Sequence, residues 1–230
     1  MIKYFLIAAL LAAGGCAGRG VEPAGTESAA PQGAAETLTA ASAALQRETF
    51  RTTVDLGQAG TMTGVSDPAG KNGEMVLKTP MPGNQMTTTV RIVAGVTYVK
   101  VKLAKSAGMP GLDGKKWRKI DNPAAAGSTE AAEALAAATE VRWVDGDTVE
   151  GTVDAAKSVE AMGVGKDAVG KMSSTMVPFE ASFDVLGRLA EYRFEMPAIG
   201  SAEPFEMVTT YSDFGTPVSV KAPAAKDVTT

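Results

Sequence analysis

The segment that decides the fold reads QMTTTVRIVAGVTYVKVKL and spans residues 85–103. On each side of the small pair Ala94-Gly95, apolar and polar residues alternate with a period of two. Because a β-strand places successive side chains on opposite faces, this pattern predicts two antiparallel strands joined by a tight turn. One face of this hairpin is expected to be buried and the other to face water.

Segments with similar strand signals lie on both sides of this hairpin, separated by turn residues such as Asp67-Pro68-Ala69-Gly70 and Asp145-Gly146-Asp147. The clearest alternation is late in the chain. There the apolar residues from Phe179 to Val185 share one face of their strand. After a turn, the apolar residues from Ala190 to Met196 likewise share one face of theirs. The predicted strands are 50–56, 61–65, 74–78, 85–93, 96–103, 141–144, 148–153, 179–185, 190–196 and 205–211.

Helical spacing appears in a few places only. Leu38, Ala41 and Leu45 recur on one face and predict a helix over 36–48. An alanine-rich stretch predicts a second helix over 128–139, and 154–162 predicts a third that ends at a glycine, with further helical signal to residue 171. Together these elements predict an α+β fold: a large curled antiparallel β-sheet, or half-barrel, with two or three helices packed on its concave side.

The amino-terminal residues predict export and lipidation. A short positive start is followed by the apolar run Tyr4–Ala13, which is too short to cross a bilayer and leads through two glycines to Cys16. We expect a lipoprotein signal peptide over 1–15 and a diacylglyceryl group on the Cys16 thiol. Residues 16–35 are small and polar, which predicts a flexible lipidated tether before a folded domain over 36–230. The expected location is the cell membrane, lipid-anchored on its extracytoplasmic face; the alternative is an ordinary secretory signal with a chance cysteine.

The composition argues against several functions. The chain has no histidine and one cysteine, which removes the commonest general base, the commonest metal ligand and internal disulfides. Its formal net charge of -4 gives no electrostatic footprint for nucleic acid. We therefore expect no enzymatic activity, no catalytic or metal-binding residues, no nucleic-acid partner and no cofactor other than a bound acyl lipid.

Basic residues gather around Trp117, between residues 100 and 119. Such a cluster with an aromatic ring could rest on anionic lipid headgroups. The interpretation we favour is that this basic segment is a solvated loop.

The predicted helices are small compared with the apolar area of the predicted strands. The chain has 11 methionines, which suit irregular cores as well as surfaces that accept variable apolar ligands; core filling is the simpler explanation for them. About nine one-faced strands expose more apolar area than two small alanine-rich helices can cover. Either the sheet curls strongly, or it leaves a space that something else fills.

Several short sequence segments resemble those of one protein family. They are Val96-Thr-Tyr-Val-Lys100, Trp117-Arg-Lys119, Val149-Glu-Gly-Thr-Val-Asp154, Asp184-Val-Leu-Gly-Arg188 and Tyr211-Ser-Asp-Phe-Gly-Thr-Pro-Val218. With the order of elements over about 36–225, they resemble the actinobacterial LppX/LprG-type lipoproteins, related in fold to the LolA/LolB lipoprotein carriers. The resemblance implies a half-open barrel that holds acylated lipid in a hydrophobic cavity.

By this analogy the cavity would be lined by the apolar strand faces. The lining residues would be Met75, Leu77, Met86, Val90, Ile92, Val99, Val101, Phe183, Tyr192, Phe194, Met196 and Met207. The expected function is non-enzymatic binding and carriage of acylated lipid or glycolipid, with the membrane, through Cys16, and an envelope transporter as further partners. The alternative is a membrane-tethered protein-interaction or scaffold domain with a filled core and no lipid ligand.

Overall fold

The computed structural model describes residues 33–105, 111–120, 128–156, 170, 172, 174–198 and 203–229. The predicted signal peptide, Cys16 and nearly all of the tether lie outside these residues, as does most of the predicted helical segment 154–171. The chain from Gln32 to Thr230 forms one compact unit, and the described fold lies within it.

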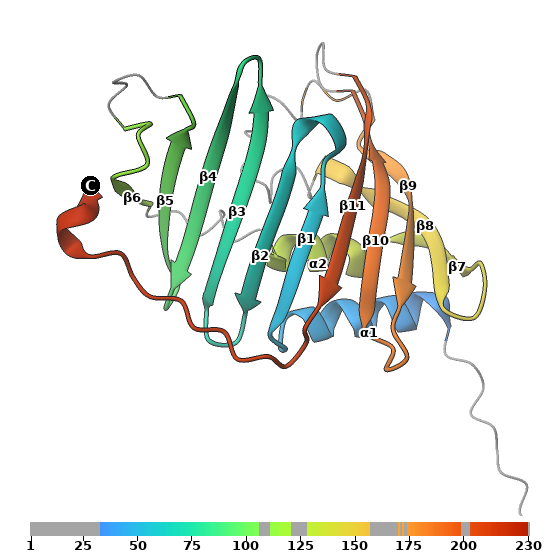
Figure 1. The fold of residues 1–230 in the computed structure, drawn as a ribbon. Helices are drawn as coiled ribbons and strands as arrows, with labels where there is room; N and C mark the ends of the chain where they lie inside the picture. The colour runs from blue at the N-terminus through green and yellow to red at the C-terminus, as the bar shows by residue number, and fades with distance from the viewer. Residues whose placement is uncertain are drawn as a thin grey trace, which may run out of the picture. The chain divides into compact units, whose positions relative to one another are not determined.

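Within the described residues, twelve strands form a single sheet in the order β12-β6-β5-β4-β3-β2-β1-β11-β10-β9-β8-β7 (Figure 1). All neighbours pair antiparallel except β12, which runs parallel to β6. The strands are β1 (Phe50–Asp55), β2 (Thr61–Asp67), β3 (Asn72–Met81), β4 (Asn84–Val93), β5 (Val96–Leu103), β6 (Trp117–Ile120), β7 (Thr139–Trp143), β8 (Thr148–Asp154), β9 (Met176–Phe183), β10 (Leu189–Met196), β11 (Phe205–Ser212) and β12 (Val228–Thr229). The large antiparallel sheet that the alternation predicts is confirmed.

Two α-helices, α1 (Ala34–Leu45) and α2 (Ser128–Ala136), accompany the sheet in the described part of the chain. Their main contacts are with each other and with β7, β8 and β10, so they lie toward one side of the sheet (Figure 1). The predicted stripe of Leu38, Ala41 and Leu45 is buried in α1, as its helical spacing requires. We call the sheet face that contacts the helices the inner face, and the opposite one the outer face.

The hydrophobic core lies between the helices and one part of the inner face, which we call the packed region: the inner face of β1 and β7–β11. Its buried sheet residues include Phe50, Val54, Val149, Val153, Val177, Phe179, Ala181, Phe183, Leu189, Tyr192, Phe194, Met196 and Met207. The packing there is close enough to require glycine. A Cβ added at Gly151 would lie 2.9 Å from the Phe179 ring and from the Thr139 carbonyl oxygen.

The hairpin predicted around Ala94-Gly95 is confirmed. Val93 pairs with Val96, and the two turn residues have φ angles of 50° and 80°. Two successive positive φ angles are the feature that lets a two-residue turn match the twist of its strands. Glycine adopts this conformation without steric cost, whereas Ala94 adopts it at some cost.

Three local predictions are wrong. The basic segment around Trp117 is not a solvated loop, because β6 hydrogen-bonds to β5 and buries the Trp117 ring. Val185 does not share the inner face, because the strand ends at Phe183 and the turn begins at Asp184. Ala190 lies at a β-bulge between the pairs Leu189–Phe183 and Glu191–Ser182, so Leu189 takes the buried position instead.

Candidate apolar binding face

The inner face of β3, β4 and β5 forms a second apolar surface, which we call the half-exposed region. Strand pairing places its residues in cross-strand rows, because antiparallel partners lie on the same face. Met75, Val90 and Val99 form one row; Leu77, Thr88 and Val101 form the next. The region's partly buried large apolar side chains are Met75, Leu77, Met86, Val90, Ile92, Val99, Val101 and Leu103, and Met81 at the end of β3 is exposed.

The two faces of these three strands differ in charge. None of the residues that β3, β4 and β5 place on the inner face is charged, whereas their outer face carries Glu74, Lys78, Arg91, Lys100 and Lys102. Charged groups are costly to bury without a partner, so their confinement to one face marks the other as the apolar one. The alternation of the sequence predicted this division.

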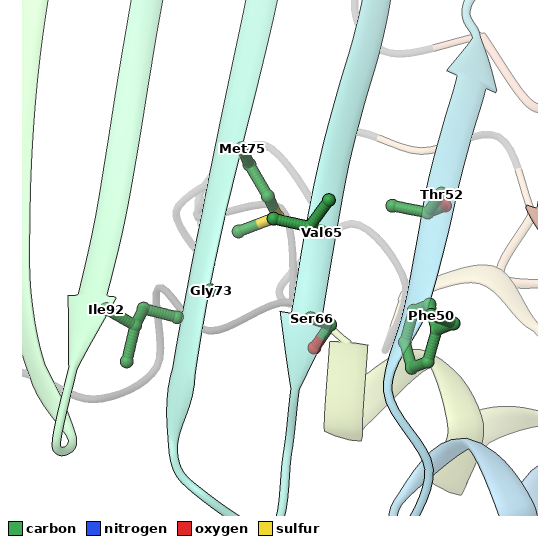
Figure 2. A pocket seen from close by; sticks show the side chains of 7 residues that line it. All are labelled: Phe50, Thr52, Val65, Ser66, Gly73, Met75 and Ile92. Atoms are coloured by element: carbon green, nitrogen blue, oxygen red, sulfur yellow. The ribbon is translucent and has the colours of Figure 1, made fainter. Parts of the chain in front are cut away.

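A shallow recess opens in the inner face where β1, β2, β3 and β4 adjoin (Figure 2). The side chains of Phe50, Met75 and Ile92 border it, and the small residues Ser66 and Gly73 form part of its floor. Its volume is about 20 Å³. This is room for about one water molecule and far too little to enclose an acyl chain.

The recess links the two regions. Phe50 belongs to the core and is buried, with its ring 5.5 Å from that of Tyr211, while Ile92 on β4 is only partly buried. Leu77 and Met62 are also partly buried and pack against the core. The apolar inner face is therefore continuous from beneath the helices to β5.

The structure divides the predicted lining residues into two groups. Seven lie in the half-exposed region: Met75, Leu77, Met86, Val90, Ile92, Val99 and Val101. The other five are buried in the packed region, where their side chains fill the core: Phe183, Tyr192, Phe194, Met196 and Met207. All twelve share the inner face of one sheet, as the alternation implied.

Sequence reasoning did not identify every residue of the face. Phe50, Ser66 and Gly73 border the recess, and Thr88 and Thr97 complete the cross-strand rows. The alternation of 85–103 contains the signal for both threonines, because each lies an even number of residues from Val90 or Val99. Glycine and serine carry no such signal, because neither is apolar enough to mark a face.

Part of the basic cluster lies on the outer face, whereas Arg118 of β6 pairs with Val99 and so lies on the inner side. Trp117 is buried on the outer face, with the Arg91 guanidinium carbon 4.7 Å and the Lys100 ammonium nitrogen 4.5 Å from its ring centroid. Arg91 also pairs with Glu74. The tryptophan therefore supports two cations by cation–π contact and has little surface left for a membrane.

Neither a metal site nor a membrane-spanning helix is found in the described residues. They bring no three ligand-type side chains of His, Cys, Asp or Glu close enough together to hold an ion. No described helix has both the length and the apolar character needed to cross a bilayer.

Two carboxyl groups in surface turns have lowered pKa values. Burial opposes ionisation of Asp184, but hydrogen bonds from the Arg188 side chain and from the backbone N–H groups of Arg188 and Leu186 outweigh it and lower the pKa of the carboxyl. The backbone N–H of Asp147 lowers the pKa of Asp145 in the β7–β8 turn. Both carboxylates stabilise turn conformations.

Comparison with protein-family models gives no match for this chain, and comparison with curated proteins gives none either. The LppX/LprG-type resemblance accordingly remains a prediction drawn from the quoted sequence phrases.

Proposed function

We propose that this chain is a non-enzymatic, extracytoplasmic lipoprotein that binds acylated lipid by laying its tails against the half-exposed region. The observation that carries the proposal is that an uncharged apolar face continues well beyond the part of the sheet that the two helices pack against. An apolar surface of this extent on a folded domain usually meets a partner. In this proposal the sheet curls as a half-barrel around the tails.

The chemistry of the face suits hydrocarbon chains of varied shape. Its large side chains are aliphatic or thioether, and Met75 and Met86 can adjust their three side-chain torsions to different tails. Thr88 and Thr97 are the polar members of its central rows, and each lies beside apolar neighbours. β3, β4 and β5 offer no charged group to a headgroup, and the adjoining β6 places Arg118 on the inner side opposite Val99, so the headgroup would remain at the edge of the face.

The energetics favour lipids with more than one tail. Each buried methylene contributes about 0.8 kcal/mol, so a sixteen-carbon tail lying on an open face and half covered gains roughly 6 kcal/mol. Association costs several kcal/mol, which leaves little for a single tail. Two or three tails roughly double or triple the gain for a single association cost. We therefore expect two-chain lipids to bind and single-chain lysolipids to bind poorly.

Native mass spectrometry of the chain from residue 32 onward tests the proposal. With a dipalmitoyl phospholipid we expect a species carrying one bound lipid, and with the matching lysolipid mainly the bare chain. Val90→Glu places a charge on the inner face and should reduce the lipid-bound fraction at least about tenfold. Its matched control is Thr89→Glu, which places the same charge on the outer face of the same strand, opposite Lys100.

Two results would count against the proposal. One is a bare polypeptide mass at every two-chain lipid concentration, together with no lipid extracted from the purified protein. The other is equal lipid binding by the two glutamate variants, which would place the lipid elsewhere.

A membrane-tethered interaction module is the second candidate, and the small volume of the recess favours it. A recess of about 20 Å³ leaves the face nearly flat, and a flat apolar face can also accept a protein partner. On this account Val90→Glu abolishes capture of a delipidated envelope protein, and added lipid has no effect on capture.

A further inference from the structure

An unusual pair of side chains lies at the tip of the β9–β10 hairpin. Val185 is 101% exposed and Leu186 71% exposed, so the apex of the turn consists of two aliphatic side chains in water. Turn apices normally carry Gly, Asn, Asp, Ser or Pro, which suit the backbone and the solvent. The fold gains no burial from either residue, so folding does not explain their presence.

The turn that presents them is firmly built. The Asp184 carboxylate accepts hydrogen bonds from the backbone N–H groups of Leu186 and Arg188 at 2.9 and 3.0 Å and pairs with the Arg188 guanidinium at 2.6 Å. Gly187 adopts a φ of +73°, and the Arg188 guanidinium carbon lies 4.5 Å from the centroid of the Phe214 ring. The two charges next to the apex therefore neutralise each other, and the apex itself is held outward.

A second exposed apolar pair lies beside the first. Trp143 is 37% exposed and Val144 54% exposed, at the start of the β7–β8 turn. The Trp143 ring is 5.9 Å from the ring of Phe183, the last residue of β9 before the turn. The backbone N–H of Phe183 also donates to the Asp147 carbonyl at 2.9 Å, which fixes the two turns side by side.

The location of these turns indicates what they meet. Figure 1 shows the β9–β10 turn at the end of the sheet where α1 crosses, and the β3–β4 turn at the opposite end. α1 contacts β7 and β10, and 32 residues precede its cap at Gly33. If Cys16 carries a lipid, the sixteen residues between it and Gly33 reach at most about 55 Å when fully extended. On that condition, the tether would keep the start of α1 within about 55 Å of a bilayer.

We infer that Val185 and Leu186 enter the interface of a lipid bilayer, with Trp143 and Val144 beside them at headgroup depth. Tryptophan is the side chain most suited to that depth, because it combines an apolar ring with a donor N–H. Asp145 and Asp147 lie in the same second turn and limit the depth of entry. The contact should therefore form on zwitterionic lipid and should not strengthen when anionic lipid is added.

A single-cysteine label provides the test. The sequence has one cysteine, at position 16, so a chain of residues 32–230 has none, and Val185→Cys gives a unique site for an environment-sensitive fluorophore. With vesicles of phosphatidylcholine we expect a blue shift and higher emission at this site. Met176→Cys is the matched control, because Met176 is a 48% exposed apolar residue on the outer face at the start of β9, at the other end of the strand from the turn. It should show no change.

Replacing the two exposed aliphatic side chains of the turn gives a second test, which is read out by flotation with vesicles. Val185→Ser with Leu186→Ser should leave the thermal midpoint unchanged, because neither side chain is buried, and should lower flotation with the vesicles about fivefold or more. Met176→Ser should leave flotation unchanged.

Three outcomes overturn the inference. Signals at both labelled sites would indicate general adsorption or unfolding, and flotation without a signal at position 185 would place the contact elsewhere. A signal at position 185 that rises with protein concentration and needs no vesicles would assign the apex to a second copy of the chain. Each outcome is independent of the lipid-binding test, because the labelled turn and the half-exposed region lie on different strands.

Discussion

The packed region and the half-exposed region are parts of one inner face, yet their residues are buried to different extents. In the packed region α1 and α2 bring side chains such as Leu38 and Leu135 against the sheet, and residues such as Leu189 and Phe194 are fully enclosed. In the half-exposed region aliphatic residues of similar size, such as Ile92 and Val99, stay partly buried. The difference shows that strand alternation sets which face is apolar, whereas the helices set which part of that face becomes a solid core.

The largest expected effect is at Leu189, which is 0% exposed. Leu189→Ala should lower the free energy of unfolding by about 2–5 kcal/mol, because it removes buried methylenes and leaves a cavity beneath the helices. Urea unfolding followed by circular dichroism measures the loss. A loss below about 1 kcal/mol would mean that this part of the sheet is not solidly packed.

Gly151 on β8 tests how tightly the packed region is filled. Gly151→Ala should cost about 1–3 kcal/mol, because the added methyl group would overlap the Phe179 ring and the Thr139 carbonyl. The same unfolding assay applies. Unchanged stability would show that β7 and β9 can move apart, which contradicts a rigid core.

Ile92 on β4 gives the direct contrast with Leu189, because the two side chains have the same number of carbon atoms. Ile92→Ala should cost less, about 1 kcal/mol, since the side chain is only partly buried and a smaller cavity is formed. Urea unfolding of both variants and of the parent chain under identical conditions measures the difference in stability loss between the two regions. If both substitutions cost the same, the distinction between the regions fails.

The smallest effect concerns the end of β9. Folding lowers the pKa of Asp184, so the carboxylate stabilises the fold above its unfolded-state pKa of about 3.9, and that stabilisation is lost as the pH falls through the folded pKa. Asp184→Asn should therefore be less stable than the parent chain at neutral pH, with the gap closing below about pH 4. A gap that does not narrow as the pH falls below about 4 would show that the ionised carboxylate is not its cause.

The sequence predicted the sheet better than it predicted its ends. The 85–103 hairpin was predicted correctly because alternation, β-branched residues and Ala94-Gly95 all agree. Strand β6 was missed because Trp117–Ile120 is short and two of its four residues are basic, and its place in the sheet depends on pairing with residues 97–99 of β5 and with β12. The Ala190 bulge was missed because one extra residue leaves no mark in composition.

The sequence predicted which face of the sheet carries the candidate site, but not which part of that face stays uncovered. All twelve proposed lining residues share the inner face, which is a consequence of period-two alternation. Their division into seven partly buried and five enclosed residues depends on where α1 and α2 lie, and these are contacts between segments distant in the sequence. Local periodicity contains no information about that placement.

One measurement tests the central claim most directly. In the chain with Val185→Ser and Leu186→Ser, which removes the inferred bilayer contact, a dipalmitoyl phospholipid with a spin label on one tail should broaden the amide NMR signals of β3, β4 and β5 and leave those of β9 and β10 unaffected. That result would place hydrocarbon on the half-exposed region alone. Broadening confined to β9 and β10, or none at saturating lipid, would contradict the account.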